Sequence, residues 1–313
     1  MLGFIARRLG FAVVTVLVSS ILVFILVHLS PTTPGVVALG NTGTPETIRA
    51  YNESIGWFDP WPVQYWRWLS GMVQGNFGQA LTDHRLIAPD LAKRLPVTFT
   101  LAALTTVFSA VVGIVLGVTA AVRRGVWNKV VTALSGVLIS MPQFWLGILL
   151  VYGFAVVLRI LPATGYTTPG QDPKKWILGL ILPVVALSVG AIGFLARQTR
   201  ASMTEALAQE HIRTLRAIGT PTWRILYVHA LRYASLPVVA GISIQFIGLM
   251  GGSVIIEQVF GLPGLGLAMQ QAVGYSDAPY VQAVVVIATL VVVVVNFALE
   301  MVSRFLDPKL RAA

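Results

Sequence analysis

The chain has 313 residues, of which 56% are hydrophobic and 11% charged, whereas soluble domains average about 25% charged residues. This composition excludes an ordinary soluble domain and indicates a membrane protein. The absence of cysteine excludes disulfides and thiolate chemistry, and the distribution of the +10 net charge argues against a nucleic-acid partner.

Six runs are apolar enough to cross a bilayer core, which is about 30 Å thick and needs roughly 20 helical residues. Because the runs are continuously apolar rather than alternating, they predict helices and not barrel strands. The expected fold class is therefore all-α, a polytopic membrane protein with six transmembrane helices. The runs are 10–29, 97–121, 130–158, 177–196, 236–259 and 281–303. The first is expected to be an uncleaved span, because Pro31 follows it without a small-residue cleavage site.

The basic residues predict the orientation of these spans. With an internal N-terminus, 14 of the 22 Lys and Arg residues fall on the inner side, and the 31–96 segment balances its basic residues with acids. This positive-inside pattern predicts that both termini are cytoplasmic. Arg159, Lys174 and Lys175 are exceptions, because they fall on an outer loop.

The 31–96 segment is the largest part outside the spans. "TPETIRAYNESIG" predicts a helix capped by Thr44 and ended by Gly56. The aromatic stretch "WFDPWPVQYWRWL" is typical of a helix at headgroup level. It is also compatible with a platform that touches an external partner, for which the candidate residues are Trp61, Tyr65 and Trp66.

Several span residues are candidates for helix packing or for lining a pathway. Gly113 and Gly117 form a G-x-x-x-G pair, which favours close helix packing. Proline in "SMPQFW" predicts a kink in the third span, and kinks occur both in pathways and in ordinary spans. Glu257 suits either an interfacial structural role or a gate, since a charge at the bilayer centre costs at least about 2.5–3.5 kcal/mol. The pathway or gate candidates are Pro142, Phe144, Gly251, Gly252 and Glu257.

Motifs for chemistry are missing from the sequence. No span carries an ionisable residue at its centre, as an ion-coupled carrier usually requires. The sequence contains no H-E-x-x-H, no G-x-S-x-G and no phosphate loop, because no lysine follows a glycine. We therefore expect a non-catalytic chain with no catalytic, cofactor or metal residues, and if ATP drives it, another chain must bind the ATP.

The stretch "RTLRAIGTPTWRILYVHAL" interrupts the apolar pattern with arginines, Gly219 and a Thr-Pro step. We predict a helical hairpin over 197–235, with one helix from Arg197 to Ile218 and a second begun by Thr220 and Pro221. In the second helix one apolar stripe recurs at helical spacing, through Trp223, Leu226, Tyr227, Ala230 and Leu231. Such a helix suits either a membrane surface or a groove on a cytoplasmic protein.

"EHIRTLRAIGTPTWRILYVHALRYASLP" resembles the cytoplasmic coupling-loop signature of ABC importer permeases, in its dipeptide/oligopeptide (peptide/nickel) form. Gly219 falls on the glycine of that signature, whereas His229 and Arg232 depart from the general pattern as the peptide subgroup does. Further similar blocks are "RLPVTFTLAAL", "SMPQFWLGILL", "EQVFGLPGLG" and the closing "DPKLR". The order of these blocks resembles the first-permease (B-type) subunit. "PTTPGVVALG", at the start of the outer loop, departs from the family pattern and touches no residue implied to contact the ATPase.

The resemblance implies a subunit of an ATP-driven peptide importer with a type I transmembrane domain in the bacterial inner membrane. Its implied partners are a second permease subunit, one or two ATP-binding subunits that hold ATP and Mg, an external solute-binding protein, a peptide and the lipid bilayer. The same family carries nickel, glutathione or haem-like cargo, and a self-contained secondary carrier is the remaining alternative. Residues implied to contact the ATPase are Arg213, Arg216, Ala217, Gly219, Thr220, Pro221, Trp223 and Arg224.

The expected organisation has four parts. They are an N-terminal segment with the first span, an outer loop with short amphipathic helices, a five-helix permease core that contains the hairpin, and a cytoplasmic tail. Their ranges are 1–30, 31–96, 97–304 and 305–313.

Overall fold

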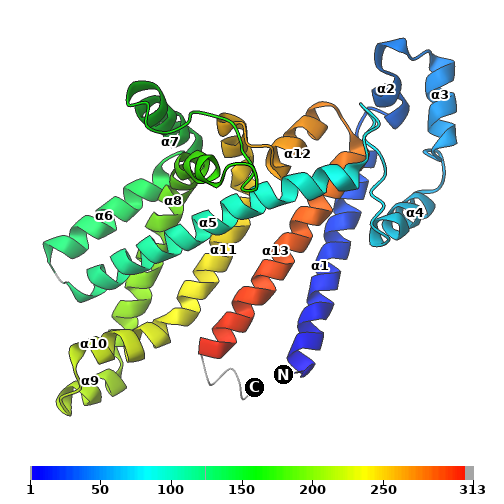
Figure 1. Cartoon of the computed structure of the whole chain (residues 1–313). Coiled ribbons are helices and arrows are strands. Elements are labelled where there is room, and N and C mark those ends of the chain that lie inside the picture. The colour runs from blue at the N-terminus through cyan, green and yellow to red at the C-terminus, as the bar shows by residue number, and fades with distance from the viewer. Residues whose placement is uncertain (1, 124, 307–313) are drawn as a thin grey trace. The chain divides into compact units, whose positions relative to one another are not determined.

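The computed structural model describes residues 2–123 and 125–306, and it contains no strand in these ranges (Figure 1). The "DPKLR" block and most of the expected tail lie outside the described residues. The all-α expectation is confirmed. The α-helices are α1 Leu2–His28, α2 Pro34–Leu39, α3 Pro45–Ser54, α4 Trp61–Val73, α5 Ile87–Val122, α6 Val126–Ser140, α7 Gln143–Leu150, α8 Pro173–Ala208, α9 Glu210–Ala217, α10 Thr222–Arg224, α11 Leu231–Phe260, α12 Leu265–Gly274 and α13 Ala278–Leu306. Two π-helical segments, Val151–Val157 and Ile225–Ala230, continue α7 and α10, and a short 3₁₀ turn covers Gly40–Thr42.

Five helices in the described residues are long and apolar enough to span a membrane. A sixth span is present if α6 and the α7 segment count together, although they are bent by 94°. The kink expected at Pro142 is thus a sharp break, because Met141 and Pro142 are both extended (ψ 125° and 123°). The five candidate spans are Ala6–His28, Ile87–Val122, Pro173–Ala208, Thr222–Phe260 and Ala278–Arg304.

The chain divides into two compact units, and each is described by itself. Unit 1 comprises Met1–Thr98 and Pro263–Val293, and unit 2 comprises Phe99–Leu262 and Val294–Ala313. Both α5 and α13 therefore contribute to each unit. The four-part organisation expected from the sequence remains a prediction.

Unit 1 has a core where the start of α5, helix α12 and the start of α13 meet. Ile87, Ala283 and Tyr280 are almost completely buried there. The buried backbone N–H of Leu265 donates to the hydroxyl of Thr98 at 2.7 Å, which satisfies a donor at the start of α12. Burial of these apolar side chains, at about 25 cal/mol per Å², fixes α12 against α5.

The loop helices of unit 1 are tied together by side-chain caps. As expected, Thr44 caps α3. Its hydroxyl accepts from the backbone N–H of Thr47, and the hydroxyl of Thr47 accepts from the backbone N–H of Thr44. Asn52 of α3 accepts from the N–H of Gly35 at 2.7 Å and donates to Thr33 at 3.0 Å. These bonds hold α2 and α3 side by side.

Unit 2 is built around α8, which packs against α6, α7 and α11. Close contact needs glycine at several crossings. A Cβ at Gly113 would lie 2.7 Å from the Cβ of Leu195, and one at Gly193 would lie 2.7 Å from the carbonyl oxygen of Ser135. The close helix packing expected at Gly113 and Gly117 is therefore confirmed.

Candidate functional site

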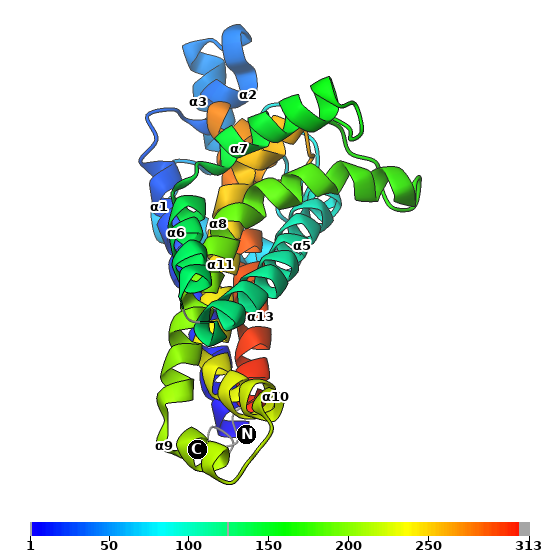
Figure 2. The same cartoon turned by 90° about the vertical axis from the view of Figure 1, so that its left-hand side faces the viewer.

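The hairpin (residues 209–230) joins α8 to α11 at one end of unit 2 (Figure 2). Gln209 is extended (φ −62°, ψ 146°) and separates α8 from α9, so the single helix expected from Arg197 to Ile218 is wrong at this residue. Gln is a good helix former, and nothing in the local sequence signals the break.

The turn of the hairpin is a Schellman motif. Gly219 is left-handed at φ 79°, its N–H donates to Arg216, and the N–H of Thr220 donates to Leu215 at 3.0 Å. Pro221 then occupies the N-cap position of α10, one residue later than the cap expected at Thr220. The turn predicted from Gly219, Thr220 and Pro221 is confirmed. The residue at which α10 begins depends on backbone angles that residue propensities do not specify.

The second arm of the hairpin continues into the fifth span as one apolar segment, Thr222–Phe260. Its π-helical part changes which side chains face the protein. Ile225 and Ala230, five residues apart, are buried, whereas Trp223 and Tyr227 are 57% and 61% exposed. The π turn adds a residue and shifts the phase, so the apolar stripe expected at 3.6-residue spacing is divided between a buried side and an exposed side.

The hairpin is anchored to unit 2 by a small apolar cluster. Met203, Ala206, Ala230 and Ala234 are completely buried together, and Ile212 of α9 is also completely buried. The Gln209 amide donates to the hydroxyl of Tyr233 at 3.4 Å. These contacts fix the hairpin to α8 and α11, so that a force on one can move the other.

The outer face of the hairpin combines apolar and cationic side chains. Ile218 is 71% exposed, and the guanidinium of Arg224 lies 5.5 Å from the ring centre of the exposed Trp223. Exposed Trp and Arg are the side chains most often found at the energetic centre of protein interfaces. Of the residues expected to contact an ATPase, only Thr220 is partly buried, and the others are exposed: Arg213, Arg216, Ala217, Gly219, Pro221, Trp223 and Arg224.

The pathway candidates cluster where α7 meets α8 and α11. Phe144 is 46% exposed, and Gly147 packs against Ile256 and Phe260 of α11. A Cβ at Gly252 would lie 3.3 Å from Oε1 of Gln143, whereas Gly251 faces open space. No local sequence pattern signals that Gln143 lies here.

Glu257 lies near the end of α11, and its side chain is completely buried. Leu262 donates to its carbonyl at 2.8 Å, and Gly261 (φ 63°) ends the helix. Among the described residues, the Glu257 side chain is therefore enclosed by the protein, and its role as a gate stays a prediction.

The aromatic residues of α4 divide into inward and outward groups. The hydroxyl of Tyr65 lies 2.8 Å from that of Ser20 on α1, whereas Trp66 is 69% exposed. Trp61 lies between these extremes, at 47% exposure with its ring 5.4 Å from that of His28. Of the three aromatic residues expected to contact an external partner, Trp61 and Trp66 are therefore exposed, whereas Tyr65 is partly buried.

His28 of α1 packs against the aromatic residues of the 31–96 segment. Its ring stacks on Trp57 at 4.4 Å, and Nε2 lies 3.0 Å from the amide oxygen of Gln64. These partners lie far along the chain from His28, and nothing in the local pattern of the sequence signals them.

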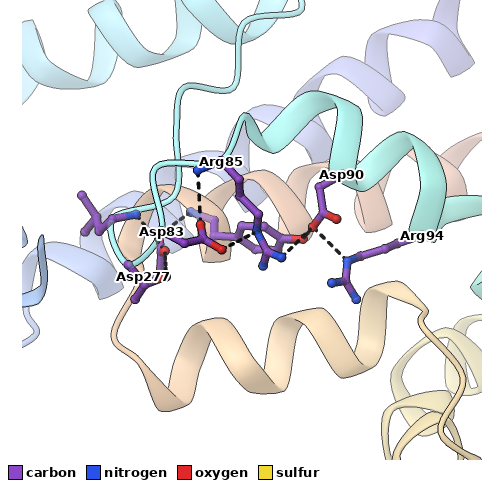
Figure 3. Close-up of polar contacts among 8 residues, drawn as sticks. Asp83, Arg85, Asp90, Arg94 and Asp277 are labelled. Carbon is purple, nitrogen blue, oxygen red and sulfur yellow. Dashed lines mark hydrogen bonds and ion pairs between the residues drawn. The ribbon is translucent and has the colours of Figure 1, made fainter.

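A polar cluster that was not predicted from the sequence links the start of α5 to the start of α13. Arg94 donates to Asp90 at 2.9 Å, Arg85 lies 3.7 Å from the same carboxylate, and the hydroxyl of Tyr280 donates to it (Figure 3). The guanidinium of Arg85 also stacks over the Tyr280 ring at 5.2 Å.

Asp277 caps the start of α13 beside this cluster. It accepts from the N–H of Leu81 at 2.8 Å and from that of Tyr280 at 3.3 Å. Burial raises the pKa of Asp277, and these hydrogen bonds oppose the increase. Among the described residues, no group of three or more His, Cys, Asp or Glu side chains could hold a metal ion.

The fold and the hairpin define the class of protein, an all-helical multi-pass membrane protein whose hairpin in unit 2 exposes cationic and aromatic side chains. The chain belongs to the family "Binding-protein-dependent transport system inner membrane component", which matches residues 113–312. The N-terminal model of the same kind of transport component matches residues 1–102. The chain is thus a permease component of the ABC transporter type, located in a bacterial inner membrane.

Similar proteins extend over nearly the whole chain. The "Probable peptide ABC transporter permease protein y4tP" of Sinorhizobium fredii is 36% identical over 309 residues, covering 98% of this chain and 99% of that protein. The glutathione transport system permease protein GsiC of Escherichia coli K12 is 34% identical over 315 residues, covering 99% of both. In the solved structures, a chain of the MetNI methionine ABC transporter in an inward facing conformation matches with a TM-score of 0.53 and 24% identity. It covers 71% of this chain and 96% of that chain, and it supports the fold alone.

Proposed function

We propose that this chain is the first permease subunit of an ATP-driven peptide importer and forms half of the translocation pathway. The cargo assignment is supported by full-length similarity to permeases named for peptide and for glutathione, itself a small peptide. The observation that carries the proposal is the exposed Trp–Arg surface of a hairpin that is rigidly anchored to two spans.

Both termini and the hairpin lie on the cytoplasmic side in this proposal, and the 31–96 segment lies outside. The positive-inside distribution supports this orientation. The external solute-binding protein then docks on the outer segment, with Trp61 and Trp66 as contacts. Tyr65 takes part only indirectly, by holding α4 against α1.

The partners are a second permease subunit and one or two ATP-binding subunits, which hold ATP and Mg. No phosphate loop occurs in this sequence, and the chain performs no bond chemistry itself. When ATP draws its subunits together, they displace the coupling hairpins. Because Ile212, Met203 and Ala230 bury the hairpin against α8 and α11, this displacement tilts the spans and opens the cavity outward. Hydrolysis resets them.

Nickel or haem-like cargo is the nearest alternative, since the same family implies it. A secondary carrier is less favoured, because the sequence offers no ionisable residue at the centre of a span.

Purification of the chain in a gentle detergent tests the proposal, with identification of bound proteins and an assay of ATP hydrolysis. We expect a second permease and an ATPase, both reduced by Arg216→Glu combined with Gly219→Pro. Lys174→Glu is the matched charge control, because Lys174 is exposed at the other end of α8. A folded chain that binds no ATPase would contradict the proposal and favour a membrane-surface role for the hairpin.

A further inference from the structure

The carboxamide of Gln143 occupies an unusual position in unit 2. It is the first residue of α7, directly after the 94° bend. Its Oε1 lies 3.3 Å from the position of a Cβ on Gly252 of α11, and its Nε2 lies 3.9 Å from that of a Cβ on Gly190 of α8. Two glycines on different helices therefore leave the space in which this amide sits.

The helices that face the Gln143 amide are uncharged over long stretches. Gly190 lies within the uncharged part of α8, residues 176–196, and Gly252 lies within the uncharged part of α11, residues 233–256. Each stretch is long enough at about 1.5 Å per residue to cross a bilayer core of about 30 Å. The amide thus lies between the uncharged stretches of two candidate spans.

Within the described part of the chain, the Gln143 carboxamide makes no hydrogen bond, and the residue is only partly buried. A polar group without a hydrogen-bond partner among apolar helices is unfavourable, and such groups usually serve a pathway or a partner. Its two N–H donors and its carbonyl acceptor remain available to a ligand.

We infer that Gln143 is a specificity-determining residue of the translocation pathway, which binds a peptide group of the cargo. A carboxamide pairs with the N–H and C=O of a peptide bond and is indifferent to the side chains, as a carrier of varied peptides requires. A lone carboxamide suits nickel poorly, because that metal prefers imidazole ligands. The inference rests on the proposed function and names the chemical group that the pathway recognises.

The test measures ATP-dependent uptake by the complete transporter in proteoliposomes, with its binding protein. The probe is a synthetic library of two- to five-residue peptides, followed by ester analogues of the best-transported peptide in which each peptide bond is replaced in turn. Gln143→Met keeps the length of the side chain and removes the hydrogen bonds. We expect it to raise the half-saturating peptide concentration about threefold to tenfold, the loss of one neutral hydrogen bond. For one ester analogue, the same substitution should have a smaller effect.

Gly252→Ala provides a second variant that leaves Gln143 in place. Its Cβ would crowd Oε1 at 3.3 Å and shift the amide, whereas Gly248→Ala meets nothing within 4 Å and serves as the control. We expect impaired uptake with Gly252→Ala and normal uptake with Gly248→Ala. If Gln143→Met does not accumulate in the membrane, the comparison of Gly252→Ala with Gly248→Ala tests the inference instead.

The outcomes separate the two claims. Normal peptide uptake by Gln143→Met and Gly252→Ala would overturn the inference and leave the proposed function intact. An equal loss for the peptide and for every ester analogue would also overturn it, because Gln143 would then act through helix packing. No uptake of any peptide by the complete wild-type transporter would overturn the proposed function itself.

Discussion

Gly117 of α5 lies so close to Thr199 of α8 that a Cβ on the glycine would be 2.5 Å from the Cβ of the threonine. Thr199 is itself completely buried, so it has no free space into which to move. The crossing of α5 and α8 therefore depends on the missing side chain.

Gly117→Val should destabilise unit 2. Adding side-chain atoms to a tightly packed contact typically costs about 1–3 kcal/mol in folding free energy. Gly117 and Thr199 both lie within long helices, which cannot shift locally to relieve the clash. The measurement is the thermal unfolding midpoint of the purified protein in detergent. Val115→Leu is the control, because Val115 of the same helix is exposed. Equal midpoints for the two variants would show that the helices separate easily at this crossing.

Tyr280→Phe should destabilise unit 1. The ring remains in the core, but Asp90 loses a donor, and a hydrogen bond to a charged group contributes about 1.5–3 kcal/mol. Tyr275→Phe is the matched control, since Tyr275 is exposed. An unchanged unfolding midpoint for Tyr280→Phe would mean that Arg94 and Arg85 alone satisfy the carboxylate.

Asp277 should make unit 1 sensitive to pH. Because burial raises the pKa of Asp277, the folded state holds its proton more tightly than the unfolded state does. Its contribution to stability is fully present below the unfolded pKa of about 4, and it is lost as the pH rises through the folded pKa.

Asp277→Asn removes this titration and keeps an acceptor for Leu81. Relative to the variant, the wild type should lose stability as the pH is raised from about 4 to about 8. Unfolding midpoints across this range provide the measurement, with the exposed Asp83→Asn as control. Parallel curves for the wild type and Asp277→Asn would contradict the assignment.

Trp223→Ser should weaken binding of the ATPase without affecting the fold. Its ring is 57% exposed, and an interface Trp typically contributes about 2 kcal/mol or more, roughly a thirtyfold change in affinity. Trp127→Ser is matched, because Trp127 is an exposed Trp on α6. Titration of the ATPase onto the immobilised permease measures both. Equal affinities would place the docking surface elsewhere.

Local sequence signals predicted the spans, the Thr44 cap, the Gly219 turn and the close packing at Gly113. Each depends on residues a few positions apart, for which capping, glycine conformation and hydropathy are decisive. The kink at Pro142 was also predicted, although its angle was not, because the bend depends on packing against α8 and α11.

Features that depend on distant residues were not predictable from one sequence. Tyr280 and Asp90 are 190 residues apart, and His28 meets Gln64 across 36 residues. Gln143 lies beside Gly252 only because the helix breaks before it. No residue propensity signals the π-helical segment Ile225–Ala230, so the exposed face of the hairpin could be identified only from the structure.

The most direct test of the central claim is peptide uptake into proteoliposomes that contain this chain with its permease, ATPase and binding-protein partners. We predict uptake that requires ATP and that is abolished by Gly219→Pro, because proline cannot adopt the φ of 79° needed at the turn. The variant should still insert into the membrane. Uptake without ATP, or normal uptake by Gly219→Pro, would contradict the account.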